Sequence, residues 1–189
     1  MSRRADITRE TGETFVEIGL GLDGSGAGSR ATGVGFLDHM LDLDVAARGD
    51  LDTGAHHTAE DVGIVLGQAL DRALGDRAGI TRYGHAVVPM DEARAACAID
   101  FSGRPFLALD AHLLPPGVTG GFDHELTEEF FRAVSSSARI TLHITIEAGT
   151  NAHHMIEAAF KAFARALRAA IAIDPTESGV PSTKGTLTT

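Results

Sequence analysis

The sequence is poor in aromatic and sulfur side chains, since its 189 residues include no tryptophan, one tyrosine and one cysteine. Cys97 cannot form an internal disulfide, and its apolar surroundings, RAACAID, predict a buried structural thiol. Positive charge is also scarce, because 16 Lys and Arg stand against 26 Asp and Glu. A net charge of -10 repels a phosphate backbone, and few aromatic rings are present to stack bases. The sequence therefore predicts no nucleic-acid partner.

Long hydrophobic runs are lacking as well. No stretch of about eighteen uncharged apolar residues occurs, and the opening MSRRADITRE has no apolar core of a signal peptide. A content of 43% hydrophobic and 22% charged residues is typical of a soluble globular protein. We therefore expect a cytoplasmic protein that is neither exported nor inserted in a membrane.

The first part of the chain has the pattern of a strand followed later by a helix. TFVEIGLG places Val16, Ile18 and Leu20 at alternate positions before the turn residues DGSG, which predicts a strand. HHTAEDVGIVLGQALDRAL has apolar residues at helical spacing, and Gly75 follows it. This spacing predicts a helix over about residues 58–74.

The second part repeats the plan. DEARAACAIDFSGRPFLALDAHL predicts two strands joined by a turn at residues 102–105, and HELTEEFFRAVSSS predicts a helix over about 125–136. In RITLHITIEAG, the residues at 140, 142, 144 and 146 face inward, and His143 falls on the polar face. A final helix follows, which Asn151 is placed to cap.

Histidine pairs mark the two parts as a tandem repeat. His56-His57 and His153-His154 lie 97 positions apart (153 minus 56), each after a strand and before a long helix. We predict an α+β fold of two homologous half-domains, residues 1–92 and 93–189. Each would be a β-sheet with helices on one side, packed as a pseudo-symmetric sandwich.

One connection differs between the halves. Where the second half has LTEEFFRAVSSS, the first has only FLDHML, and the period-two pattern of a strand begins soon after His39, at Leu43 and Val45. The first half thus lacks two or more helical turns after Met40, through a true deletion or through residues omitted from the written sequence.

The pattern His-His-x-x-Glu occurs twice, as HHTAE and HHMIE. In a helix the first His and the Glu share a face, whereas adjacent histidines diverge by about 100°. A single copy would be typical of a solvated helix start. Two copies, one at the equivalent place in each half, indicate two metal sites that draw ligands from both halves. Nitrogen and carboxylate ligands suit Mn, Fe, Zn or Ni rather than Ca. The predicted ligands are His39, His56, His57, Glu60, His143, His153, His154 and Glu157.

A second group of candidate residues is cationic or hydroxylic. Several of its members lie in loops, and one lies a turn beyond Glu157 on the same helical face; they are Arg82, Arg104, Lys161, Ser182 and Lys184. Arginine forks beside Ser and Lys in a Gly-containing loop suit a phosphate monoester. Three further histidines lack such partner residues in the sequence, and we expect them to be ordinary surface or strand residues: His85, His112 and His124.

The segments FLDHM, HHTAED, VPMDE, SGRP, NAHHMIEAAFKAFARALR and GVPSTKG together resemble the imidazoleglycerol-phosphate dehydratase family, in order and over nearly the whole chain. The resemblance implies a homo-oligomer of 24 subunits with active sites between subunits and two manganese ions per active site. It also implies that the eight residues named above are the metal ligands, and that the second group of candidate residues contacts the substrate and its phosphate. It adds Glu13 as an acidic substrate-binding residue. In the family a helix containing a Gln continues after LDHM, so about nine residues are missing here.

The reaction implied is loss of water from imidazole glycerol phosphate to give imidazole acetol phosphate in histidine biosynthesis. Metals that bind the imidazole ring would help it feed electrons toward the departing hydroxyl. Glu13 is the first candidate for the base that takes the hydrogen, with Glu60, Glu157 or a metal-bound water as alternatives. From the residues alone, a dinuclear metallohydrolase acting on a small phosphoester and a non-catalytic metal-binding assembly stay open.

Overall fold

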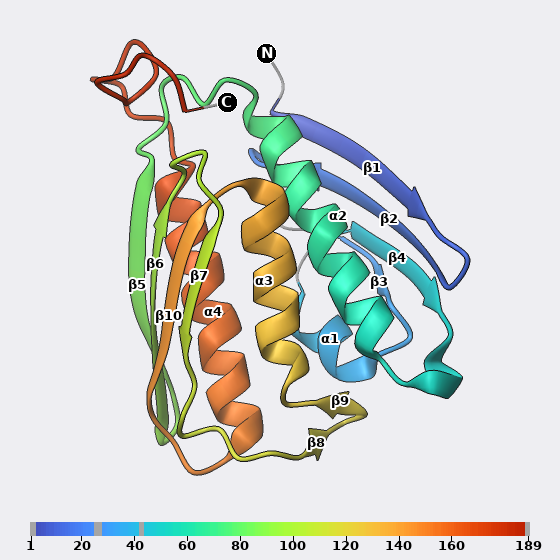
Figure 1. The fold of residues 1–189 in the computed structure, drawn as a ribbon. Coiled ribbons are helices and arrows are strands. Elements are labelled where there is room, and N and C mark those ends of the chain that lie inside the picture. The colour runs from blue at the N-terminus through green and yellow to red at the C-terminus, as the bar shows by residue number, and fades with distance from the viewer. Residues whose placement is uncertain (1–2, 25–27, 42–43, 188–189) are drawn as a thin grey trace. The chain divides into compact units, whose positions relative to one another are not determined.

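A computed structural model describes residues 3–24, 28–41 and 44–187 (Figure 1). Asp42 and Leu43, at which the short connection of the first half was expected to turn into a strand, lie outside the described residues. The chain forms two compact units, and the second unit is not simply the second half of the sequence. Unit 1 contains residues 1–73 and 116–138, and unit 2 contains residues 74–115 and 139–189.

Unit 1 holds a four-stranded sheet in the order β1-β2-β4-β3. Its strands are β1 (Arg4–Glu10), β2 (Thr14–Gly21), β3 (Arg30–Ala31) and β4 (Asp44–Gly49). β2 is antiparallel to both β1 and β4, whereas β3 runs parallel to β4. Val16 and Ile18 of β2 pair with Ala47 and Val45 of β4, and all four side chains are buried, so one face of the sheet is apolar.

Unit 2 holds a sheet with the same order and the same strand directions. Its strands are β5 (Tyr83–Met90), β6 (Ala93–Asp100), β10 (Thr141–Ala148) and β7 (Phe106–Asp110), in the order β5-β6-β10-β7. β6 is antiparallel to β5 and β10, and β7 is parallel to β10. Because β5 pairs with β6, the second sheet begins at Tyr83, before the half-domain boundary predicted after residue 92.

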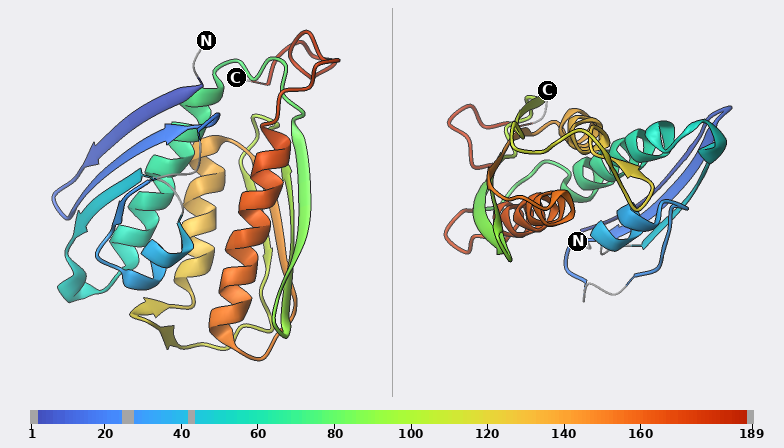
Figure 2. Two further views of the ribbon diagram at one scale, coloured as in Figure 1. Left: turned by 180° about the vertical axis from the view of Figure 1, so that it is seen from behind. Right: turned by 90° about the horizontal axis from the view of Figure 1, so that it is seen from below.

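Helices cover the apolar faces. The chain contains α1 (Gly35–Met40), the short 3-10 helix η1 (Leu51–Thr53), α2 (His56–Leu74), α3 (Leu126–Ala138) and α4 (Ala152–Ala170), and a small hairpin of β8 (Val118–Thr119) and β9 (Phe122–Asp123). Figure 2 shows α4 along one face of the β5-β6-β10-β7 sheet. At the start of α2, Asp61 accepts hydrogen bonds from Arg9 and Thr14 of the first sheet. The predicted α+β class, with two sheets each packed with helices, is confirmed.

Local predictions also hold. α2, α3 and α4 begin within two residues of the expected positions, and the Asn151 side chain caps α4 by accepting from the His153 N–H at 2.9 Å. Cys97 is buried, and burial raises the pKa of its thiol to about 12. Among the described residues, none of the helices combines the length and hydropathy that a membrane crossing requires.

α2 packs against α3 through two glycines on one face, Gly63 and Gly67. A Cβ placed on Gly67 would lie 2.6 Å from the Cβ of Ser137 and 2.8 Å from both the Ala138 N and the Val134 O. Two of these three atoms belong to the backbone of α3, so they cannot simply rotate away. The absence of a side chain at Gly67 therefore sets how closely the two helices approach.

We predict that Gly67→Ala lowers the free energy of unfolding by about 1–3 kcal/mol, because overpacking outweighs the better helix propensity of alanine. Thermal denaturation of the purified protein measures the change. Gln68→Ala, at the exposed next position of α2, is the matched control and should leave the midpoint nearly unchanged. A Gly67→Ala protein as stable as the control would contradict this account of the interface.

Candidate functional site

The first His-His-x-x-Glu element lies at the start of α2, as predicted. The His56 Nε2 is 3.9 Å from a Glu60 carboxylate oxygen, so the two side chains share a helix face. The His57 ring stands at 87° to the His56 ring and turns to other partners. Its Nδ1 is 3.4 Å from carboxylate oxygens of both Glu13 and Asp50. The adjacent histidines thus diverge, and Glu13 belongs to this cluster.

The second element lies in the first turns of α4 in unit 2. His153 Nε2 is 3.1 Å from Glu157 Oε2, and the Lys161 ammonium is 2.6 Å from the other carboxylate oxygen. The Glu157 side chain is only 9% exposed, so it is a partly desolvated carboxylate between two nitrogen groups. Nitrogen and oxygen donors at adjacent turns of one helix can serve a divalent transition metal.

Glu92, which the sequence reasoning missed, holds the remaining histidine of this element. One carboxylate oxygen lies 2.7 Å from His154 Nδ1, and the other accepts the backbone N–H groups of Asn151 at 2.8 Å and Thr150 at 3.1 Å. These hydrogen bonds lower the pKa of Glu92 to about 2, and the bond from His154 has the largest effect. Glu92 in turn raises the pKa of His154. Glu92 lies in the tight turn between β5 and β6, and its 62-residue separation from His154 hides the contact from sequence patterns.

The two other predicted ligands lie on different elements. His39 is exposed on α1 in unit 1, and His143 is exposed on β10 in unit 2, with its ring centroid 6.0 Å from that of Phe106. The prediction that each metal draws ligands from both halves stays a prediction. Of the histidines set aside as ordinary, His85 is exposed, but His124 is buried and bonded to Thr119, and His112 pairs with Asp110 at 2.6 Å.

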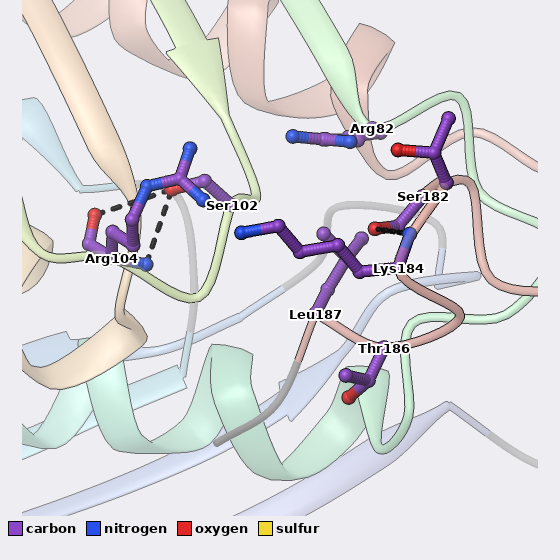
Figure 3. A pocket seen from close by; sticks show the side chains of 8 residues that line it. Arg82, Ser102, Arg104, Ser182, Lys184, Thr186 and Leu187 are labelled. Carbon is purple, nitrogen blue, oxygen red and sulfur yellow. Dashed lines mark hydrogen bonds between the residues drawn. The ribbon is translucent and has the colours of Figure 1, made fainter.

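A cationic pocket of about 400 Å³ lies in unit 2. Its walls carry Arg82, Arg104, Ser182 and Lys184, four of the five residues predicted to contact phosphate, together with Ser102, Thr183, Thr186 and Leu187. Figure 3 shows the nitrogen ends of Arg82, Arg104 and Lys184 directed toward a shared space. The fifth predicted residue, Lys161, is not part of this wall and instead pairs with Glu157.

Arg82 is held in place by two neighbours. Its guanidinium bonds both carboxylate oxygens of Asp100, at 2.7 and 3.2 Å, and donates to the Pro181 carbonyl at 2.8 Å. The hydrogen bond to Asp100 raises the pKa of Arg82, so its charge is permanent. Sequence reasoning left out Ser102, although it lies in the SGRP segment that resembles the family. Its hydroxyl accepts the Arg104 N–H at 3.1 Å and thereby shapes the loop.

These two clusters of unit 2 lie at opposite ends of α4. His153 and Glu157 are in its first turns, whereas the backbone N–H of Arg82 donates to the carbonyl of Ala170, the last residue of the helix, at 2.8 Å. A helix of 19 residues is about 28 Å long. The nitrogen and oxygen donors of α4 and the cationic pocket therefore occupy separate places on unit 2.

Comparison with known proteins shows the family to which the sequence belongs. A model of the imidazoleglycerol-phosphate dehydratase family matches residues 32–167. The chain belongs to this family. Imidazoleglycerol-phosphate dehydratases are lyases of histidine biosynthesis, and the chain is a dehydratase of this class. Its relatives include the imidazoleglycerol-phosphate dehydratases of Jannaschia sp. (strain CCS1), 54% identical over 98% of this chain and 100% of the relative, and of Moorella thermoacetica, 52% identical over 99% and 100%.

Solved structures agree with the sequence comparison. The imidazoleglycerol-phosphate dehydratase of Staphylococcus aureus subsp. aureus N315 is 41% identical, with a TM-score of 0.77 over 90% of this chain and 99% of that one. The enzyme from Pyrococcus furiosus, solved in complex with (S)-C348, is 37% identical, with a TM-score of 0.79 over 95% and 99%.

The dehydratase alignments also bear on the short first half. The alignment to the Jannaschia protein spans 195 positions, although this chain has only 189 residues, so it includes at least six positions that this chain lacks. Within the described residues, α1 has six residues, whereas α3, which precedes the equivalent strand of the second sheet, has thirteen. The helix of the first half is shorter than its counterpart, as predicted.

Proposed function

We propose that this chain dehydrates imidazole glycerol phosphate to imidazole acetol phosphate. The observation that carries the proposal is the pocket of unit 2, in which Arg82, Arg104 and Lys184 gather positive charge on a chain with a net charge of -10. Such a pocket suits the phosphate of the substrate, because guanidinium forks and an ammonium match its oxygens. Anchoring a non-reacting phosphate orients the rest of the molecule for reaction.

The donor set fits the two manganese ions per active site that the family resemblance implies. Imidazole nitrogens and carboxylate oxygens are suitable ligands, and His153 and Glu157 already approach within 3.1 Å. We propose His39, His56, His57, Glu60, His143, His153, His154 and Glu157 as the ligands. When bound, the ions would act as Lewis acids toward the imidazole ring of the substrate.

Glu13 is our first choice for the group that accepts the side-chain hydrogen of the substrate. Its side chain is 60% exposed beside His57, so its carboxylate is open to a substrate. Glu157 is a weaker choice, because its two oxygens already contact His153 and Lys161. The remaining alternatives are Glu60, which is 3.9 Å from His56 and 44% exposed, and a metal-bound water.

The separation along α4 supports active sites formed between copies of the chain. The substrate has only a glycerol chain between its imidazole ring and its phosphate, so it is far shorter than α4. It therefore cannot contact His153 and Glu157 at the start of α4 and, at the same time, the cationic pocket at the other end of the same unit 2. We therefore propose a cytoplasmic homo-oligomer, of 24 subunits as the family resemblance implies. Light scattering of the native protein should give 24 times the chain mass of 19.8 kDa.

The central test is turnover of imidazole glycerol phosphate by the manganese-loaded protein. We expect imidazole acetol phosphate to form without inorganic phosphate, and Lys184→Ala to raise the KM about 10–100-fold, because a charged hydrogen bond to phosphate is lost. Arg165→Ala removes an exposed cation of α4 outside the pocket and serves as the control. Release of inorganic phosphate would instead favour a dinuclear metallohydrolase.

A separate prediction concerns the metal. Glu92→Gln removes the carboxylate that orients His154, and such a partner of a ligand typically contributes about 10–100-fold to metal affinity. We expect manganese binding to weaken by that factor in calorimetric titration of the metal-free protein. Glu147→Gln, which alters a carboxylate paired with Arg94 on the same sheet, is the control. Equal manganese affinity in the two variants would count against Glu92 as the group that orients His154.

A further inference from the structure

Arg77 is fully buried in the loop after α2, at a left-handed φ of 64°. Its Nη1 donates to the carbonyl oxygens of Phe101 at 3.1 Å and Arg139 at 3.3 Å, and a weaker contact of 3.5 Å reaches the carbonyl of Leu187. Its guanidinium carbon lies 5.6 Å from the centre of the Phe101 ring. Burying a charge is unfavourable unless polar partners surround it, so these carbonyls and the charge hold one another in place.

Two of these carbonyls belong to residues in or next to the wall of the cationic pocket. Phe101 directly precedes Ser102, and Leu187 itself lines the pocket. The two segments touch at this point, because a Cβ on Gly103, which has a φ of +76°, would lie 2.1 Å from the Leu187 oxygen. Arg77 thus lies behind the junction of the loop at 101–104 with the C-terminal segment.

The C-terminal wall of the pocket is held near both ends by arginines. Arg82 donates to the carbonyl of Pro181, just before the segment 182–187, and Arg77 contacts the carbonyl of Leu187 at its end. Between these points the segment bonds to itself: the Gly185 N–H donates to the Ser182 carbonyl at 2.9 Å, and the Lys184 N–H donates to the Ser182 hydroxyl at 3.2 Å. The placement of Ser182 and Lys184 therefore depends on the two anchored ends.

We propose that Arg77 is a positioning residue that holds the two walls of the anion pocket together and thereby sets its affinity for the substrate phosphate. The proposal rests on the proposed function, since it assigns the phosphate to this pocket. Arg77 acts through the Phe101 and Leu187 carbonyls and does not line the pocket itself. Lysine is a poor replacement, because its shorter side chain lacks the planar guanidinium that lies over the Phe101 ring and places Nη1 among the three carbonyls.

Arg77→Lys tests the proposal, with Arg94→Lys as the matched control on an exposed arginine of the same unit, paired with Glu147 at 2.7 Å. We expect Arg77→Lys to raise the KM for imidazole glycerol phosphate about tenfold while kcat stays within about threefold. Hydrogen exchange should accelerate in the amides of residues 182–187 and stay unchanged in β5 and β6. A folded Arg77→Lys protein with the KM and exchange of the control would overturn the proposal.

A second variant decides the case if Arg77→Lys does not fold. Gly103→Ala keeps Arg77 but places a methyl group against the Leu187 carbonyl, so it should also raise KM with little change in kcat. An unchanged KM in this variant would overturn the proposal. If the wild-type protein gave no turnover, the proposed function would fail by itself, and titration with inorganic phosphate together with hydrogen exchange would still decide the role of Arg77.

Discussion

The close contact of α4 with β5 is the constraint on which both clusters of unit 2 depend. A Cβ on Gly84 would lie 2.0 Å from the carbonyl oxygen of Ala166 and 2.7 Å from the N of Ala170, so only glycine allows the helix backbone to approach the strand. This contact fixes α4 along the sheet. His154, at one end of the helix, then meets Glu92 of the β5–β6 turn, and Ala170, at the other end, accepts the Arg82 N–H.

Charge on this chain is arranged locally rather than globally. The overall balance is strongly acidic, yet the pocket stays cationic. Asp100 neutralises only part of its positive charge, because Arg104 and Lys184 add two cations beside Arg82. At the other end of α4, Glu92 accepts two backbone N–H groups and contacts His154 Nδ1, while the Nε2 of that ring lies 3.7 Å from a carboxylate oxygen of Asp91. Carboxylates thus orient a cation at one end and a metal-ligand candidate at the other.

Sequence alone predicted features that depend on local periodicity. The helices behind both histidine pairs, the inward face of β10 and the cap at Asn151 follow from spacings of two and of three to four residues. Glu92 and Arg77 were missed because their contacts join distant segments; Arg77 and Leu187 are 110 residues apart. The second sheet likewise begins earlier than predicted, because only strand pairing assigns β5 to β6.

The shortening of the first half affects a segment outside the sheet, where residues can be lost without changing the strand register. Within the described strands, β2 and β4 pair Val16 with Ala47 and Ile18 with Val45, as β6 and β10 pair Cys97 with Ile144 and Ile99 with Leu142. Loss of a single residue inside a strand would turn its buried side chains to the other face, whereas loss of helical turns outside the sheet leaves the register intact. The histidines on α2 keep their place beside that sheet, through Asp61 and its bonds to Arg9 and Thr14. The shortening therefore bears on His39 at the end of α1, and the pairing of β2 with β4 and the contacts of Asp61 do not depend on it.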